Sequence, residues 1–85
     1  MLAIADHAGM DLCSVIGSNI RKLRAAKGLS QEELAFRAEI DRSYLSEIEN
    51  GHKNLSVMVL DQIAAALEID LRELFEGYKR GARTK

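Results

Sequence analysis

The chain carries a group of polar side chains whose types and spacing could read DNA. They lie at the three- and four-residue intervals that share one face of an α-helix, and they are Arg42, Ser43, Ser46 and Glu47. Arginine can donate two hydrogen bonds to O6 and N7 of a guanine, and glutamate can accept one from N4 of a cytosine. We predict base contacts here, with a solvated helix face as the alternative. Arg42 could instead contact a phosphate, and Glu47 could instead position Arg42.

Two short helices joined by a tight turn would present these side chains. Ser30 followed by Glu33 is a capping box, which predicts a helix over 31–38. Asp41 is a good N-cap for a second helix over 42–49. Helices this short must pack on their neighbours to be stable. The pair is typical of a helix-turn-helix, whose second helix enters the major groove with its first turn near the base edges.

The remaining elements complete an all-α fold. Apolar residues at helical spacing predict a first helix over 12–27 that Gly28 ends, a fourth helix capped by Ser56, and a short fifth helix over 71–75. We expect a compact five-helix bundle containing a helix-turn-helix. Its predicted parts are a flexible segment 1–11 in which Asp11 could cap the first helix, a domain over 12–76, and a basic tail 77–85.

Composition and motifs exclude several classes of protein. A chain of 85 residues, 47% hydrophobic and 29% charged, is typical of one soluble globular domain. Its single cysteine, Cys13, is expected to be a small buried apolar residue, and with His7 and His52 far apart we expect no metal and no cofactor. No apolar run approaches the ~20 residues of a membrane helix, so we expect a cytoplasmic protein with no membrane partner. No catalytic triad, phosphate loop or acid pair is evident, so no enzyme is expected.

The net charge of −1 argues at first sight against nucleic acid, but the charges are unevenly distributed. Residues 20–56 carry seven basic and six acidic residues, and residues 77–85 carry four basic residues and no acid. A phosphate backbone responds to segregated charge rather than to net charge. Binding to double-stranded DNA is therefore compatible with the composition.

Three runs of residues resemble the lambda-repressor/Cro-like (XRE-type) DNA-binding family. They are Ile20-Arg-Lys-Leu-Arg24, Gly28-Leu-Ser-Gln-Glu-Glu-Leu-Ala35 and Tyr44-Leu-Ser-Glu-Ile-Glu-Asn-Gly51. The runs Asp41-Arg-Ser-Tyr-Leu-Ser46 and Asn54-Leu-Ser56 narrow the resemblance to the controller proteins of restriction–modification systems. One departure is Glu39, which stands in the turn where the family often has glycine with positive φ; a non-glycine residue there costs on the order of 1 kcal/mol.

The resemblance implies roles for further residues. It implies a partly buried ion pair between Arg24 and Glu49. It also implies a set of phosphate contacts, to which the Tyr44 hydroxyl could add, although its ring could also pack on the bundle. The predicted phosphate contacts are Gln31, Tyr44, Asn50, His52, Lys53, Asn54 and Ser56.

The function implied is a sequence-specific transcriptional regulator. Such a protein would bind a pseudo-palindromic operator as a homodimer and control its own operon, with RNA polymerase as a further candidate partner. We expect the dimer surface to come from the fifth helix and the end of the fourth, with the apolar residues Leu71, Leu74 and Phe75 as candidates, although part of this set could belong to the core. The alternatives are an antitoxin that represses a toxin–antitoxin operon, and a protein-interaction module that has lost DNA binding.

Overall fold

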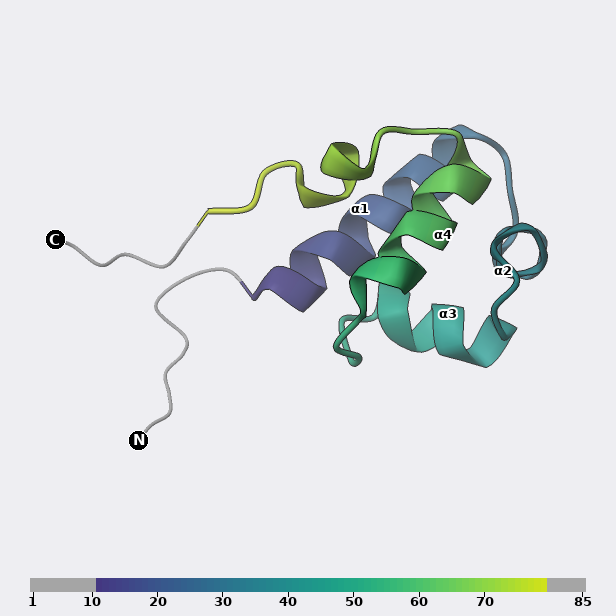
Figure 1. Ribbon diagram of the computed structural model, residues 1–85, viewed down its shortest axis with the longest axis horizontal. Helices are drawn as coiled ribbons and strands as arrows, with labels where there is room; N and C mark the ends of the chain where they lie inside the picture. The colour runs from purple at the N-terminus through teal and green to yellow at the C-terminus, as the bar shows by residue number, and fades with distance from the viewer. Residues whose placement is uncertain (1–10, 80–85) are drawn as a thin grey trace, which may run out of the picture.

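The protein folds into helices that surround one apolar core. The computed structural model describes residues 11–79, so the N-terminal segment before Asp11, with His7, and the tail beyond Lys79 lie outside the described residues. The elements are α1 (Leu12–Ala26), α2 (Gln31–Ala38), α3 (Arg42–Glu49), α4 (Val57–Leu67) and a 3-10 helix, η1 (Leu71–Phe75) (Figure 1). Residues 11–79 contain no strand, which confirms the all-α prediction.

The last element differs from the predicted fifth α-helix. Residues 71–75 form a 3-10 helix, with hydrogen bonds from the Glu73 amide to the Asp70 carbonyl (2.9 Å) and from the Glu76 amide to the Glu73 carbonyl (3.3 Å). Five residues are too few for the i to i−4 hydrogen bonds of a stable α-helix, whereas the tighter 3-10 turn is common in short pieces. Over residues 11–79 the fold is therefore four α-helices and one 3-10 turn.

The helices begin where the sequence predicts them. Ser30 and Glu33 form the capping box of α2, with both reciprocal hydrogen bonds in place at 3.0 and 2.8 Å. Asp41 caps α3 through the Ser43 amide, and Ser56 caps α4 through the Val59 amide. Asp11 occupies the N-cap position of α1, but its carboxylate accepts a hydrogen bond from the Ser14 hydroxyl (3.0 Å) and caps no backbone amide. The prediction that Asp11 caps α1 is thus correct only in position.

All four α-helices end with a residue in the left-handed conformation, but only two of these residues are glycine. Gly28 follows α1 with φ of 71° and Gly51 follows α3 with φ of 76°. Glu39 (φ 61°) ends α2, as its place in the turn predicts, and Glu68 (φ 59°) ends α4. At each of the four ends the next amide bonds back to a carbonyl five residues earlier. This pattern satisfies the last carbonyls of a helix.

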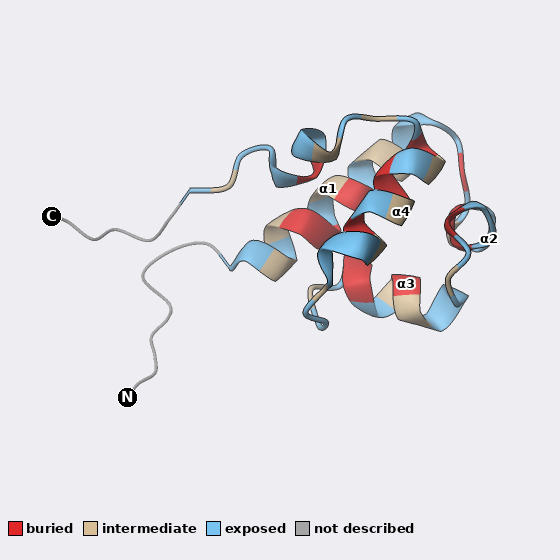
Figure 2. Cartoon of the chain, viewed as in Figure 1, coloured by how far each residue is buried: buried red, intermediate tan, exposed pale blue. Residues whose placement is uncertain are grey.

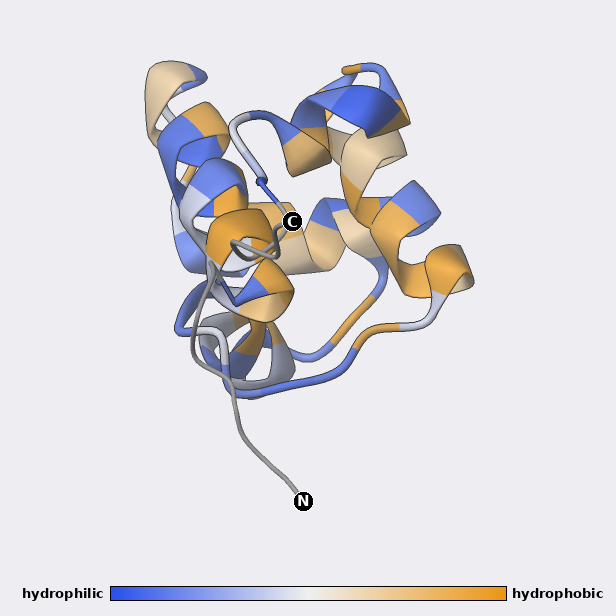
Figure 3. Ribbon diagram, turned by 90° about the vertical axis from the view of Figure 1, so that its left-hand side faces the viewer, coloured by the Kyte–Doolittle hydropathy of each residue, from blue (hydrophilic) through white to orange (hydrophobic). Residues whose placement is uncertain are grey.

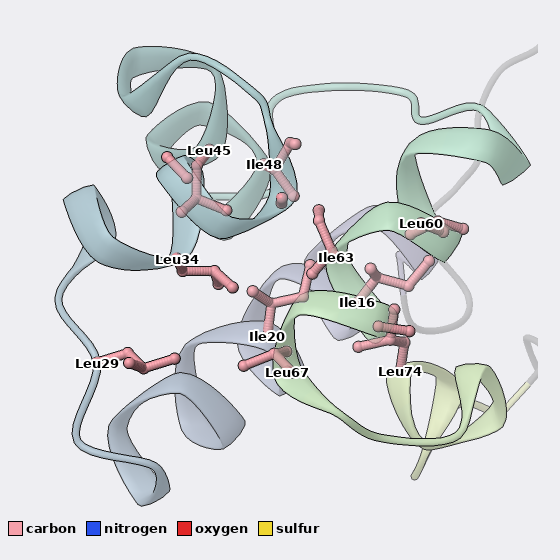
Figure 4. Close-up of a cluster of buried hydrophobic side chains, with 13 residues drawn as sticks. Ile16, Ile20, Leu29, Leu34, Leu45, Ile48, Leu60, Ile63, Leu67 and Leu74 are labelled. Carbon is pink, nitrogen blue, oxygen red and sulfur yellow. The ribbon is translucent and has the colours of Figure 1, made fainter.

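The core joins all five elements. α2 packs against α3 and α4, α1 packs against α3 and η1, and α4 packs against η1. The buried side chains from these elements point into one central space (Figure 4). Each helix carries both hydrophobic and hydrophilic segments (Figure 3), as expected for helices that bury one face and expose the other.

Candidate nucleic-acid interface

The helix α3 is amphipathic and exposes its first turn. Leu45 and Ile48 are buried in the core and fix the helix on its inner side. Arg42 and Ser43 are exposed, and Glu47 is exposed one turn later. Figure 2 shows the N-terminal end of α3 in the colour of exposed residues. Of the remaining residues predicted to touch DNA from α3, Ser46 and Tyr44 are half-buried, and Tyr44 packs against the core. Of the five α3 residues predicted to contact DNA, only Tyr44 packs against the core. The other four keep their polar groups near one outer surface of the helix.

A buried carboxylate anchors α3 to α1. The Glu49 side chain is fully buried and accepts two hydrogen bonds from the Arg24 guanidinium, from Nε to Oε2 at 2.7 Å and from Nη2 to Oε1 at 3.0 Å. Arg24 also donates to the Leu29 carbonyl at 2.9 Å. The ion pair expected from the family resemblance is present, and its two parallel hydrogen bonds fix both the distance and the angle between the helices.

The environment of Glu49 favours its charged form. Burial of the carboxylate opposes ionisation, but the hydrogen bonds from Arg24 and Gln31 and the positive charges of Arg24 and Arg21 outweigh it. The pKa of Glu49 is therefore lowered from its ordinary value of 4.5. The same hydrogen bond to Glu49, acting against burial, raises the pKa of Arg24. Both groups are charged at neutral pH, so the pair is a true ion pair.

Gln31 links this buried pair to the exposed end of α3. Its Nε2 donates to Glu49 Oε1 at 3.0 Å, and its Oε1 accepts from Arg42 Nη1 at 3.4 Å. Gln31, which is predicted to contact a DNA phosphate, thus also orients Arg42, which is predicted to read a base. Sequence spacing alone did not indicate this connection, because it depends on how closely the starts of α2 and α3 approach.

The loop after α3 holds the other predicted phosphate contacts and is tied to α1. Asn50 accepts a hydrogen bond from Arg21, and Asn54 accepts one from Cys13. Lys53 lies 3.6 Å from the Glu47 carboxylate, a contact between half-exposed groups. His52 is exposed, and the Ser56 hydroxyl accepts the capping hydrogen bond of α4 at 3.1 Å. The side chains of Asn50, Lys53, Asn54 and Ser56 each make a contact within the protein, whereas His52 bonds through its backbone amide to the Glu47 carbonyl at 2.9 Å.

Two residues of α1 have roles that the sequence did not predict. Cys13 was expected to be buried and apolar, but it is half-buried and its thiol donates to Asn54 Oδ1 at 3.3 Å. The expectation was wrong because Cys13 lies in the first turn of α1, beside the polar loop and away from the core. Gly17 lies where α1 and α3 meet, and a Cβ there would overlap the Ile48 carbonyl oxygen. Only glycine allows this approach.

Of the three residues predicted for the dimer surface, one is exposed. Leu74 has no exposed surface and belongs to the core, and Leu71 packs against the core, so only Phe75 is exposed. The structure adds apolar residues that the sequence did not single out, since Val57 and Met58 at the start of α4 are 69% and 70% exposed. Met58 lies opposite the helix face that Leu60, Ile63 and Leu67 bury, so a helical projection of α4 could have identified it. Val57 lies seven residues before the buried Ala64, near the edge of that face, and is exposed in the first turn of α4.

Within residues 11–79 no histidine, cysteine and acidic side chains gather in a group that could hold a metal ion. None of the helices described is both long and apolar enough to cross a membrane. The polar groups on this surface belong to arginine, lysine, amide and hydroxyl side chains, which can form hydrogen bonds and ion pairs. Those donors match the phosphates and base edges of DNA.

The helix-turn-helix family model HTH_3 matches residues 20–74, which include the whole of α2 and α3. The chain belongs to the helix-turn-helix family. The control protein C.MunI of a Mycoplasma species is 45% identical to this chain over 65 residues, which are 75% of the chain and 88% of C.MunI.

Two solved structures extend the comparison. The restriction-modification controller protein C.AhdI from Aeromonas hydrophila is 48% identical, with a TM-score of 0.73 over 74% of this chain and 96% of its own. A tetramer of the controller protein C.Esp1396I, solved in complex with its natural 35 base-pair operator, is 37% identical, with a TM-score of 0.72 over 79% of this chain and 88% of its own. The resemblance to controller proteins predicted from the sequence is confirmed.

Proposed function

We propose that this helix-turn-helix protein binds double-stranded operator DNA through α3 and regulates transcription, including that of its own operon. One observation carries the proposal. Arg42 and Ser43 are exposed at the first turn of a helix whose opposite face is locked into the core. A rigid helix with a polar, exposed first turn fits the major groove.

The relatives favour a controller of a restriction–modification system. C.MunI and C.AhdI are named as control or controller proteins, and C.Esp1396I was solved on its operator. A methyltransferase gene and an endonuclease gene beside the gene for this chain would support that assignment. A toxin-like reading frame there would favour the antitoxin alternative instead. RNA polymerase would be a further partner if the regulator activates transcription.

We further propose that the DNA-bound form is a homodimer. Two copies would place their α3 helices about 34 Å apart, one turn of B-DNA, and so recognise a pseudo-palindrome. Phe75 and the more exposed pair Val57 and Met58 are among the exposed apolar residues that could cover one another between copies. Sedimentation without DNA should give a species of twice 9.4 kDa at micromolar concentration. A 9.4 kDa species alone at high concentration would contradict the homodimer.

Footprinting on the DNA upstream of the gene tests the function, and two substitutions test the roles of the residues. Arg42→Ala should relax sequence preference, because losing a bidentate guanine contact costs about 1–3 kcal/mol at one base position. Asn54→Ala should weaken binding to all sequences alike, since phosphate contacts carry no direct base information. A uniform loss from Arg42→Ala would make Arg42 a backbone contact.

Salt dependence separates this function from an interaction module that has lost DNA binding. If a dimer neutralises about eight phosphates, log K should fall against log salt with a slope near −7. The exposed Lys53 and the start of α2 at Gln31 motivate this estimate. A slope shallower than about −2 would favour the interaction module.

A further inference from the structure

Asn50 and Asn54 share an arrangement that the proposed DNA contacts do not explain. Asn50 Oδ1 accepts a hydrogen bond from Arg21 Nη2 at 2.8 Å, and Asn54 Oδ1 accepts one from Cys13 Sγ at 3.3 Å. Both donors come from α1, and both acceptors lie in the segment after α3. In each case the bond occupies the oxygen of a side-chain amide.

The chemistry of the amide gives this arrangement a consequence. An asparagine side chain has one oxygen acceptor and one NH2 group with two donors. When the oxygen is held by a donor from α1, the NH2 group is directed away from that donor. Among the hydrogen bonds of residues 11–79, neither Asn50 Nδ2 nor Asn54 Nδ2 donates to a protein group. Both NH2 groups therefore have no partner within residues 11–79, and phosphate oxygens accept hydrogen bonds but do not donate them.

We propose that Cys13 and Arg21 are positioning residues that turn the Asn54 and Asn50 amides so that their NH2 groups face the DNA backbone. The proposal rests on the proposed function and names two residues of α1 that act through the phosphate contacts. Without these donors an amide can rotate by half a turn and present its oxygen to a phosphate, which repels it. The bond from α1 thus selects the binding orientation before DNA arrives, which lowers the ordering cost of association.

The geometry of α1 supports a common role for the two residues. Cys13, Gly17 and Arg21 follow one another at intervals of four, so they share one face of the helix. Gly17, in the middle, allows the closest approach to the α3 backbone, and Arg21 also donates to the Glu49 carbonyl at 3.4 Å. The distance between the two donors and the two amides is therefore set by backbone packing rather than by flexible side chains alone.

Cys13 provides the cleaner test, because it carries no charge. The probe is a fluorescent duplex of arbitrary sequence, about 30 base pairs long, at low salt, since phosphate contacts do not require the operator. Cys13→Ala removes the donor and should weaken binding about threefold for each protomer engaged, the range of one neutral hydrogen bond. Cys13→Ser retains a donor and should restore most of the affinity. In the Asn54→Ala background, Cys13→Ala should have no further effect.

Arg21 is tested in the same way, with a control for its charge. Arg21→Ala should weaken binding more in the wild-type background than in the Asn50→Ala background. Lys22→Ala removes a positive charge from the neighbouring exposed position of α1 and serves as the matched control. The loss that Arg21→Ala shares with Lys22→Ala is due to charge, and the excess that disappears with Asn50 is due to positioning.

The outcomes separate this inference from the proposed function. If the wild-type protein binds the duplex but Cys13→Ala binds equally well, or loses the same affinity with and without Asn54, the positioning role is overturned and DNA binding stands. If Cys13→Ser is as weak as Cys13→Ala while both melt like the wild type, the donor is not what matters and the role is again overturned. If the wild-type protein does not bind the duplex even at low salt, both proposals fail.

Discussion

Removing Arg24 should destabilise the protein far more than the loss of an ordinary surface ion pair. Arg24→Ala leaves the fully buried Glu49 carboxylate with the Gln31 amide at 3.0 Å and the Arg21 guanidinium at 3.7 Å. Breaking a buried ion pair costs about 3–5 kcal/mol because one charge remains uncompensated. We expect about 3 kcal/mol, the lower end, because Arg24 is itself 16% exposed and two neighbours partly replace it.

A double-mutant cycle isolates the interaction. Glu49→Ala should cost somewhat less than Arg24→Ala, since Arg24 keeps its hydrogen bond to the Leu29 carbonyl and can reach water. The double mutant should be little worse than Arg24→Ala alone, which gives a coupling free energy of about 2 kcal/mol. Chemical denaturation followed by circular dichroism measures all four free energies of unfolding.

A matched pair on the surface provides the control. Arg72 and Asp70 are also 3.0 Å apart, but their side chains are 90% and 50% exposed. Arg72→Ala should leave the denaturation curve almost unchanged, because exposed ion pairs contribute little. A coupling near zero between Arg24 and Glu49, or an equal loss from Arg72→Ala, would refute the reasoning that burial makes the first pair strong.

Three further outcomes follow from the structure. Because the pKa of Glu49 is lowered in the folded state, the stability that its charge gives the folded protein is complete above about pH 4.5 and is lost as the pH falls through the folded pKa. Glu49→Gln should therefore be less stable than the wild type at neutral pH but lose less stability on acidification. Denaturation at a series of pH values measures this difference. Gly17→Ala should cost about 1–3 kcal/mol, because its Cβ would overlap a backbone carbonyl of α3, and a melting temperature equal to that of the wild type would contradict the close approach. Glu39→Gly and Glu68→Gly should each stabilise the protein by up to about 1 kcal/mol by removing left-handed strain, and destabilisation in both would argue that the glutamates are not strained.

The sequence predicted how the helices begin better than how they end. Ser30, Asp41 and Ser56 cap helices because their short polar side chains compete for backbone amides, a local preference that the sequence states directly. The end of α4 at Glu68 could not be predicted in the same way, because glutamate rarely adopts positive φ. Packing of Leu67 and Ile69 on either side of Glu68 imposes that conformation, and packing is not visible in a local pattern.

In the candidate site, too, local features could be predicted from the sequence, whereas contacts between distant residues could not. Residue types and helical spacing were enough to place Arg42 and Ser43 on an exposed first turn, and the family resemblance supplied the Arg24–Glu49 ion pair. The contacts of Cys13 join residues 41 positions apart, and no signal in one sequence marks such a pair. The sequence left Leu74 as a candidate for either the dimer surface or the core, because an apolar residue on a short helix can face either one, and the fold places it in the core.

The internal contacts of the proposed interface affect how DNA could bind. Gln31 uses one of its two amide hydrogens on Glu49, and Arg42 uses one of its five donors on Gln31, so each side chain has further donors that these two contacts leave unused. The contact between Lys53 and Glu47 is different, because it is long, exposed and competes directly with a phosphate or a cytosine for the same groups. The contacts of Gln31 and Arg42 hold these side chains in place and so reduce the entropy lost when DNA binds. The contact between Lys53 and Glu47 must instead be broken before either residue can contact DNA. Substituting Glu47 should therefore release Lys53 for phosphate contact as well as remove an acceptor, so a gain in nonspecific affinity would accompany any loss of base preference.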